Sequence, residues 1–408
     1  MDEELSEHGE RVAYILYELS KDKRMEGKFD LDKLLLLGLF HDIGAYKTEK
    51  IDDLFTFETG DVWQHAVYGY VFLKYIGPLK EYAEAILFHH LNYEELPLVQ
   101  CKYPDYANFI YLADRIDVVY SKETDRKPDL NKLLELSGTR FDAAFVEAFF
   151  EANKDNRLVE NLLSGAYRQI IDARFDQMEI SNEDALGFLK MLIYSVDFKS
   201  DYTVTHTVNT MAISKHLADA FGLSGEQTKK VSLGAALHDL GKLGVPIEIL
   251  EYKGRLAEAE MEIMRRHVEY TETILKDAVT EEVFNIAVRH HEKLDGSGYP
   301  HGLKGEDLSF EERIVAVADI VSALTSERSY KEPFPKDRTI KILTEMSQEG
   351  KLDSRICDGV CAHYDKVMEE TAASRQEVID QYNYMAKDYQ YILQMIQVNS
   401  QKFQQEVE

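Results

Sequence analysis

The sequence predicts an all-α protein with two tandem helical domains, at residues 1–180 and 181–408, and a long C-terminal helix. Glycine and proline are scarce, at 22 and 8 of 408 residues, so few points interrupt regular structure. Apolar residues recur at intervals of three and four, as in 12–19 and 211–218, which is the helical period. One ordered set of histidines occurs twice, which indicates two copies of one helical unit.

The C-terminal segment 372–408 is expected to form the long helix, because its apolar residues keep helical spacing. These residues are Val378, Tyr382, Met385, Tyr389, Ile392 and Ile396. Such a stripe suits packing on the body of the protein or on a second subunit, so a homodimer is one of two open interpretations. The segment 125–183 has no counterpart in the other copy, and we expect it to supply connecting helices.

The composition is that of a soluble globular protein, with 45% hydrophobic and 30% charged residues. A net charge of −27 argues against binding of a polymeric nucleic acid, which would be repelled. A small anionic substrate would require a local cluster of cations or metal ions.

The three cysteines, Cys101, Cys357 and Cys361, are too few for a disulfide framework and indicate a reducing compartment. We interpret Cys357 and Cys361 as buried thiols, because no further cysteine pair completes a zinc site. The chain shows no signal peptide, and its longest apolar run, 34–40, is too short to span a bilayer. The expected location is therefore the cytoplasm, without membrane insertion.

Two matching series of histidine and aspartate residues are the main chemical signal. The first series is His8, His41, Asp42, His65, His89, His90 and Asp114. The second series is His206, His238, Asp239, His267, His290, His291 and Asp319. Each series contains one His-Asp pair and one His-His pair at the same places in the order, so chance positioning of core histidines is a poor explanation.

Neutral imidazoles and carboxylates are common ligands of iron, manganese and zinc. Seven of them suit two roughly octahedral ions that share one carboxylate. Neighbouring residues on a helix point about 100° apart, but at a helix end both His290 and His291 can turn toward a pair of ions. Two ions about 3.5–4 Å apart can clamp a phosphoryl group and activate a water as hydroxide, which fits phosphodiester hydrolysis.

Six stretches of the segment 184–365 resemble the HD-GYP family of the HD phosphohydrolase superfamily. They are Tyr202-Thr-Val-Thr-His206-Thr, His238-Asp239-Leu-Gly-Lys242, His267, His290-His291-Glu-Lys-Leu-Asp-Gly-Ser-Gly298-Tyr299-Pro, Ala318-Asp319 and Leu324-Thr-Ser-Glu-Arg328-Ser-Tyr-Lys331. The resemblance implies an all-helical HD domain that hydrolyses a cyclic dinucleotide, either cyclic di-GMP or 3',3'-cyclic GMP-AMP, to a linear dinucleotide by metal-activated hydroxide.

The resemblance also assigns roles to residues. The seven members of the second series would bind two iron or manganese ions, with Asp239 as the bridging ligand. Lys242 would contact the scissile phosphate, which makes Asp239 and Lys242 the catalytic pair. Gly298, Tyr299, Arg328 and Lys331 would contact the substrate. Some family members recruit a third metal through a Glu four residues before the first histidine, and here that position is Tyr202, which favours two ions.

The first copy keeps every ligand position but lacks the substrate contacts. Ala45 stands in place of Lys242, the Gly-Tyr-Pro stretch is absent, and Glu123 and Arg126 occupy the positions of Arg328 and Lys331. This N-terminal HD domain is therefore a second candidate metal site. A structural or dimerising module, a regulatory nucleotide-binding domain and an independent phosphohydrolase all remain open. Glu4 lies four residues before His8, too near the terminus to count as a ligand.

Two alternatives to a cyclic-dinucleotide phosphodiesterase also remain open. One is a metal-dependent protein that senses a nucleotide and passes the signal to a partner. The other is an HD hydrolase that acts on another nucleotide. The glycine-rich stretch 295–300 occurs only in the second copy, and we expect it to be pliable enough for backbone and Tyr299 to approach a bulky substrate.

Overall fold

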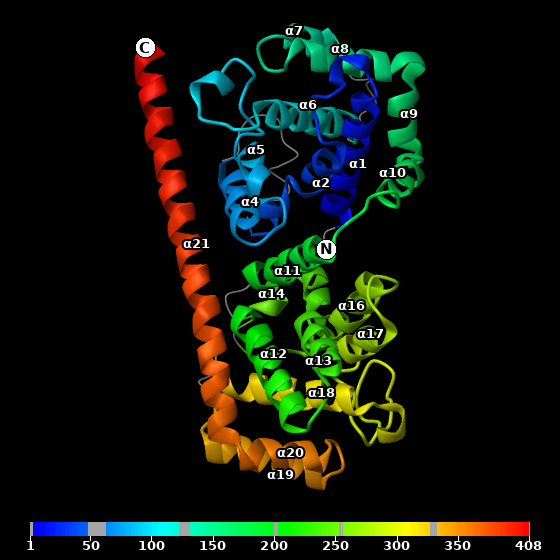
Figure 1. Cartoon of the computed structure of the whole chain (residues 1–408), viewed down its shortest axis with the longest axis vertical. Coiled ribbons are helices and arrows are strands. Elements are labelled where there is room, and N and C mark those ends of the chain that lie inside the picture. The colour runs from blue at the N-terminus through cyan, green and yellow to red at the C-terminus, as the bar shows by residue number, and fades with distance from the viewer. Residues whose placement is uncertain are drawn as a thin grey trace. The chain divides into compact units, whose positions relative to one another are not determined.

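The computed structural model describes residues 3–47, 63–121, 131–199, 203–252, 254, 256–326 and 333–407. These residues form helices, two isolated β-bridges and no β-strand (Figure 1). The predicted all-α fold is thereby confirmed.

The chain folds as two compact units. We call Asp2–Met191 together with Met385–Glu408 the N-terminal unit, and Leu192–Tyr384 the C-terminal unit. The boundary between the first unit and the second thus falls within helix α11, Asn182–Lys199. The domain division at residues 180 and 181 stays a prediction.

Nine further helices of the N-terminal unit precede α11. They are α1 (Glu3–Ser20), α2 (Leu31–Phe40), α4 (Trp63–Tyr75), α5 (Ala83–Leu87), α6 (Pro104–Ser121), α7 (Asn131–Glu135), α8 (Ala143–Ala152), α9 (Arg157–Ser164) and α10 (Tyr167–Phe175), counted among the described residues. A short 3₁₀ helix, η2 (Ile43–Lys47), follows α2.

The C-terminal unit repeats the first part of this order. Its helices are α12 (Thr203–Ala220), α13 (Gly225–Leu237), η6 (Leu240–Gly244), α14 (Ile247–Leu250), α15 (Glu258–Arg265), α16 (His267–Leu275), α17 (Glu281–Val288), α18 (Phe310–Thr325), α19 (Lys336–Gln348) and α20 (Ser354–Ala362). Six elements of the two units correspond in order: α1, α2, η2, α4, α5 and α6 in the first, and α12, α13, η6, α16, α17 and α18 in the second. Helices α14 and α15 are additional in the second unit, relative to the described residues of the first. The duplication read in the sequence is therefore a duplication of structure.

Local signals explain where several of these helices begin. Ser224 and Ser309 form capping boxes with Gln227 and Glu312 at the starts of α13 and α18, and each serine accepts a hydrogen bond from the backbone N–H three residues on. Asp30 caps α2 in the same way by accepting from the Lys33 N–H. The caps fix the first turns of α2 and α13, whose far ends lead into the His-Asp pairs, and of α18, which carries Asp319.

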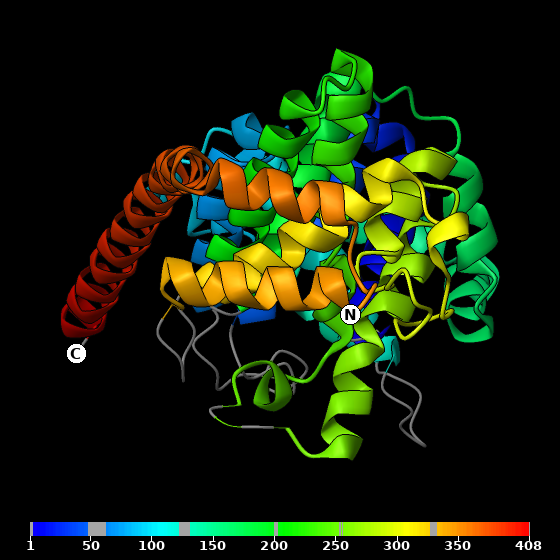
Figure 2. The same ribbon diagram turned by 90° about the horizontal axis from the view of Figure 1, so that it is seen from below.

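The core of the C-terminal unit lies between α12, α13, α18 and α20. Ile213, Val231, Ile314, Val317 and Ile356 belong to one fully buried apolar cluster there. Helices α19 and α20 pack side by side (Figure 2). Cys357 on α20 is buried in this core and Cys361 is half-buried, so the expectation of buried thiols holds fully for Cys357.

The helices between α6 and α11 are more than connectors. Phe145 and Phe149 of α8 are fully buried, as is Ile171 of α10. The Asn161 side chain of α9 donates a hydrogen bond of 2.9 Å to the Tyr14 hydroxyl on α1. These helices therefore contribute to the core of the N-terminal unit, beside the helix that carries His8.

The long C-terminal helix is confirmed as α21 (Tyr364–Val407). Its residues from Met385 onward belong to the N-terminal unit. There the Asp388 carboxylate accepts hydrogen bonds from Lys74 Nζ at 2.9 Å and from the Tyr75 hydroxyl at 2.8 Å. Tyr389 packs on Tyr68 of α4, with ring centroids 3.9 Å apart. The stripe is therefore partly used within the chain itself.

Candidate metal centres

The structure brings the second histidine–aspartate series together at one place in the C-terminal unit. His206 lies on α12, His238 and Asp239 end α13, His267 begins α16, His290 and His291 follow α17, and Asp319 lies on α18. Six of the seven side chains are buried, and His291 is about one quarter exposed. The centre is thus closed on most sides and opens where His291 lies.

The donor atoms form two groups of three, each compact enough for one ion. The first group is His206, His238 and Asp239, and the second is His267, His290 and His291. Within each group one donor atom per residue lies within 4.8 Å of the others.

Two carboxylates link these groups. Asp239 directs Oδ2 toward His238 Nε2, at 3.1 Å, and Oδ1 toward His267 Nε2, at 3.5 Å. Asp319 similarly lies 3.0 Å from His206 Nε2 and 3.5 Å from His291 Nδ1. This is the arrangement that a bridging carboxylate between two ions requires.

Backbone carbonyls orient three of the imidazoles. The Nδ1 atoms of His238, His267 and His290 lie 2.7, 2.6 and 2.6 Å from the carbonyl oxygens of Ala235, Met264 and Ala287. A carbonyl only accepts, so Nδ1 carries the proton and Nε2 keeps a lone pair that points inward. The imidazoles are thereby set as Nε2 ligands.

Burial and charge favour the ligand forms of most of these groups, whereas Asp239 and Asp319 raise the pKa of His238 against the effect of burial. Burial lowers the pKa of His291 to about 3 and that of His290 well below its usual range. Burial would raise the pKa of Asp239, but His238 and Lys242 hold it well below the usual range. Neutral imidazoles and ionised carboxylates at neutral pH are the states that bind metal ions.

The N-terminal unit holds a matching centre. One group consists of His8, His41 and Asp114, and the other of Asp42, His65, His89 and His90. Buried donor atoms here have no hydrogen-bond partner within the described part of the chain, namely His41 Nε2, Asp42 Oδ1 and His89 Nε2. Buried polar atoms are rarely left unsatisfied, so orphan atoms aimed into one space fit the metal ions that HD domains hold.

Close packing of a short 3₁₀ helix assembles both centres. A Cβ atom on Gly241 of η6 would lie 1.9 Å from the His267 carbonyl oxygen, and one on Gly44 of η2 would lie 2.1 Å from that of His65. Only glycine allows this approach, which brings each His-Asp pair to the third histidine. The glycine of the His-Asp-x-Gly sequence therefore has a packing role.

The two centres differ in how the first histidine is held. In the N-terminal unit His8 Nδ1 lies 2.7 Å from Asp117 Oδ2, and Asp117 pairs with Arg11 at 2.6 Å. In the C-terminal unit the corresponding partner of His206 is the Ser322 hydroxyl, at 2.9 Å. Ser322 donates to the His206 carbonyl at 3.0 Å, so its oxygen accepts from Nδ1.

Larger differences concern the residues around the two clusters of donor atoms. The Lys242 ammonium group lies 2.5 Å from Asp239 Oδ2, whereas the N-terminal counterpart, Ala45, is a buried methyl group. Arg328 and Lys331, and likewise Glu123 and Arg126, lie outside the described residues. The substrate contacts inferred from the sequence can therefore be placed only for Lys242, Gly298 and Tyr299.

The glycine-rich stretch after His291 is held more firmly than its composition suggests. The Glu292 carboxylate accepts hydrogen bonds from the backbone N–H groups of His301 and Leu303, at 2.8 and 3.0 Å. A Cβ atom on Gly298 would lie 2.4 Å from the α-carbon of Glu292, so the chain folds back onto itself there. The buried Glu292 carboxylate thus anchors the chain just after this stretch, and the expected pliability of residues 295–300 stays a prediction.

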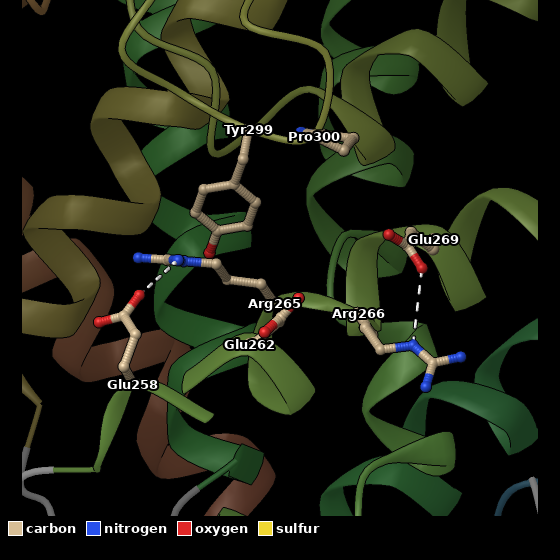
Figure 3. A pocket seen from close by; sticks show the side chains of 7 residues that line it. All are labelled: Glu258, Glu262, Arg265, Arg266, Glu269, Tyr299 and Pro300. Atoms are coloured by element: carbon tan, nitrogen blue, oxygen red, sulfur yellow. Dashed lines mark hydrogen bonds and ion pairs between the residues drawn. The ribbon is translucent and has the colours of Figure 1, made fainter. Parts of the chain in front are cut away.

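The stretch places Tyr299 beside the cluster of histidine and aspartate residues. Its ring lies against His291, with centroids 4.7 Å apart. Arg265 lies near the same ring, with its guanidinium carbon 5.7 Å from the Tyr299 centroid. A cleft of about 700 Å³ is lined by Tyr299, Pro300, four residues of α15 and α16, and Arg266 between these helices (Figure 3).

The sequence interpretation missed three kinds of residue at the two centres: the partners Asp117 and Ser322, the anchor Glu292, and the cleft arginines Arg265 and Arg266. A signal existed for the first kind, because Asp117 and Ser322 stand three residues after Asp114 and Asp319, one helical turn away. Arg265 and Arg266 directly precede His267, where the first copy has Trp63 and Gln64. That difference marks a feature of the second copy alone.

Comparison with known proteins adds family relationships. A family model described as "HD domain" matches residues 5–119, and a second model with the same description matches residues 190–356. Both matches cover a complete ligand series.

Similar curated proteins include three that are relevant to the centres. The 3'3'-cGAMP-specific phosphodiesterase 1 of Vibrio cholerae serotype O1 is 29% identical over 381 residues, which cover 86% of this chain and 85% of the relative. The 3'3'-cGAMP-specific phosphodiesterase 3 of the same organism is 32% identical over 248 residues, which cover 59% of this chain and 53% of the relative. A cyclic di-GMP phosphodiesterase of Thermotoga maritima is 36% identical over 174 residues, which cover 42% of this chain and 46% of the relative.

Among solved structures, the cyclic GMP-AMP specific phosphodiesterase V-cGAP3 of V. cholerae matches with a TM-score of 0.57 and 20% identity. The match covers 88% of this chain and 92% of that chain, and at this identity it supports the fold alone. No helix among the described residues is long and apolar enough to cross a membrane.

Proposed function

The chain belongs to the HD-GYP type of HD-domain proteins, with two HD domains in tandem, and on that premise we propose that it is a metal-dependent phosphodiesterase acting on a cyclic dinucleotide. The substrate class is cyclic di-GMP or 3',3'-cyclic GMP-AMP, and the product is the linear dinucleotide. The observation that carries the proposal is that a complete ligand set, Lys242 and the Gly-Tyr-Pro stretch meet at one centre. The N-terminal centre has the ligand set alone.

In this proposal the seven ligands of the C-terminal unit hold two ions, with Asp239 between them. Two such ions, when bound, supply Lewis acidity and a water nucleophile for phosphodiester hydrolysis. The mixed imidazole and carboxylate donor set, without thiolate, suits the iron or manganese that the family resemblance implies.

Residues around the ions position the substrate. Lys242 contributes a cation beside Asp239, where it would neutralise charge that develops on the scissile phosphate. Gly298 and Tyr299 form the rim of the opening at His291, where a ligand reaches the ions. Arg328 and Lys331 are proposed as further phosphate contacts on the resemblance alone.

The N-terminal centre is proposed as a second metal site that does not cleave the cyclic dinucleotide. Its ligands are His8, His41, Asp42, His65, His89, His90 and Asp114, and its orphan buried atoms support ion binding. Ala45 and the missing Gly-Tyr-Pro stretch leave it without the substrate contacts of the other centre. A structural or dimerising role accounts best for the repeated ligand pattern within this chain.

A homodimer and a cytoplasmic location complete the proposal. Tyr384, Tyr391 and Met395 of α21 expose 62%, 61% and 46% of their surface, at spacings of seven and four residues. That spacing resembles a coiled-coil seam, which supports association through α21. A substrate that is an intracellular signal fits the expected cytoplasmic location.

The direct test is turnover by purified protein loaded with iron or manganese. Cyclic di-GMP and 3',3'-cyclic GMP-AMP would be incubated separately, and the linear products separated by chromatography. We expect at least one of them to be cleaved, and Asp239→Ala to abolish cleavage. If neither is cleaved while Asp239→Ala changes only nucleotide binding, the protein is a sensor instead.

A further inference from the structure

The cleft beside Tyr299 has a mixed lining that does not resemble a phosphate site. Its charged residues are Glu258, Glu262, Arg265, Arg266 and Glu269 (Figure 3). Three carboxylates beside two guanidinium groups would repel a further anion. They offer hydrogen-bond acceptors and donors side by side, which suits a neutral ligand that presents both.

The arginines are available to such a ligand. Arg265 pairs with Glu258 at 3.3 Å, but these side chains are 46% and 86% exposed. Arg266 pairs with Glu269 at 3.7 Å, and both are more than half exposed. Exposed ion pairs of this kind contribute little energy, so a ligand can replace them.

The cleft adjoins the metal centre through one aromatic ring. Tyr299 lies between them, with its ring 4.7 Å from that of His291 and 5.7 Å from the Arg265 guanidinium carbon. Figure 3 shows the Tyr299 hydroxyl directed toward Arg265. A nucleotide whose phosphate lies at the ions would therefore reach the cleft with its base.

The internal duplication supports a substrate role. Trp63 and Gln64 occupy the positions of Arg265 and Arg266 in the first copy, which also lacks Lys242 and the Gly-Tyr-Pro stretch. The arginine pair thus occurs together with the other features that separate the proposed catalytic centre from its copy. A merely structural surface pair has no reason to follow that division.

We propose that this cleft is a guanine-reading subsite. The Arg265 guanidinium donates two parallel hydrogen bonds to O6 and N7 of the base, the pairing by which arginine commonly selects guanine. Glu262, one helical turn before Arg265, accepts from the N1–H and 2-amino groups. Adenine presents a 6-amino donor where guanine has O6, so it is rejected. The inference rests on the proposed function, because it assigns one base of the same substrate.

Turnover of three substrates tests the subsite. Values of kcat/KM would be measured for cyclic di-GMP, 3',3'-cyclic GMP-AMP and cyclic di-AMP. Arg265→Ala is expected to lower kcat/KM roughly tenfold to a hundredfold for the two guanine-containing substrates and to leave cyclic di-AMP unchanged. Arg265→Lys is expected to fail as a replacement, since lysine lacks the two-pronged geometry. An equal loss for all three substrates, or no loss, would overturn the proposal.

Binding supplies a second readout that does not depend on cleavage. Dissociation constants of GMP, IMP and AMP would be measured on the full-length manganese-loaded protein. The wild type should prefer GMP to AMP about tenfold or more, and Arg265→Ala should reduce that preference to within about twofold. Glu262→Gln should remove the preference for GMP over IMP, which lacks only the 2-amino group. Equal dissociation constants of GMP and AMP for the wild type would contradict a guanine-reading subsite.

Folding is not a confounding factor for these variants. Helix α15 has no buried residue, so the substitutions should leave the thermal unfolding midpoint unchanged. Lys341→Ala on α19, which removes a cation that is 74% exposed, serves as the charge control and should leave all ratios unchanged. If the wild type cleaves no cyclic dinucleotide but still prefers GMP to AMP, the proposed function fails while the guanine subsite stands.

Discussion

The Lys242 ammonium group lies 2.5 Å from Oδ2 of Asp239, whose Oδ1 lies 3.5 Å from Nε2 of His267 in the other group of donor atoms. One turn of 3₁₀ helix separates the two residues, and Gly241 between them packs on the backbone of α16. The same turn in the first copy ends in Ala45. At this turn the two centres therefore differ by one side chain, a lysine against an alanine.

Lys242→Ala is expected to lower kcat by about 10²–10³ with little change in metal content. The substitution removes a donor aimed at developing negative charge but leaves all seven ligands in place. Steady-state kinetics and metal analysis of one sample would check this. Activity within threefold of the wild type would show that Lys242 only stabilises Asp239.

Gly298→Ala should lower kcat/KM for the cyclic dinucleotide at least tenfold. The new methyl group would lie 2.4 Å from the α-carbon of Glu292, so the stretch carrying Tyr299 must move away from His291. Gly305→Ala is the matched control, because its methyl group would meet Leu294 only at an ordinary 3.6 Å. Equal activity of the two variants would contradict a role for the fastened stretch.

Ser322→Ala should weaken metal binding at the C-terminal centre by about tenfold to a hundredfold. The hydroxyl group orients His206 through Nδ1, and loss of such a partner commonly weakens metal sites by this factor. Titration of the metal-free protein with manganese would measure it, with the exposed Ser354→Ala as control. An unchanged dissociation constant would mean that α12 alone orients His206.

The metal-free protein should lose stability as the pH falls from about 6.5 to about 5. Burial lowers the pKa of His65 to about 4 and that of His291 to about 3, from 6.5. In this window the two imidazoles bind protons in the unfolded chain but stay neutral in the folded chain. The free energy of unfolding therefore falls by about 1.4 kcal/mol per pH unit for each imidazole.

Between about pH 6.5 and about pH 5 the opposite shift of His8 does not change the free energy of unfolding. Hydrogen bonds that the His8 ring donates to Asp114 and Asp117 raise the pKa of His8 to about 10, against the effect of burial. His8 therefore stabilises the fold fully below about pH 6.5, and that stabilisation is lost only as the pH rises toward about 10. Urea unfolding of chelator-treated protein at the two pH values is the measurement. An equal or higher free energy of unfolding at the lower pH would contradict the lowered pKa values of His65 and His291.

The sequence was sufficient for the helical fold and for the grouping of His206 with the other ligands, because the duplication repeats residue order and spacing. The comparison of Lys242 with Ala45 also predicts which residues contact the substrate and not the metal, and that division stays a prediction. Both conclusions depend on pattern within the chain and need no knowledge of packing.

The contacts of the residues around the candidate ligands could not be predicted from the sequence in the same way. Glu292 accepts hydrogen bonds from the backbone at His301 and Leu303, and this contact of a carboxylate with its own loop has no counterpart in the composition of the stretch. Arg265 meets Tyr299 only because that loop folds over α15. Contacts between segments that are about thirty residues apart leave no periodic signal.

Cyclic dinucleotide turnover by Asp239→Ala and Asp42→Ala, measured beside the wild type with metal analysis of each sample, tests the central claim most directly. Asp239→Ala should lose the ions of the C-terminal centre and all hydrolysis. Asp42→Ala should lose the ions of the N-terminal centre and keep hydrolysis within about an order of magnitude, because Lys242 and Tyr299 serve only the other centre. Hydrolysis that survives Asp239→Ala, or that disappears only with Asp42→Ala, would contradict the assignment of the chemistry to the C-terminal HD domain.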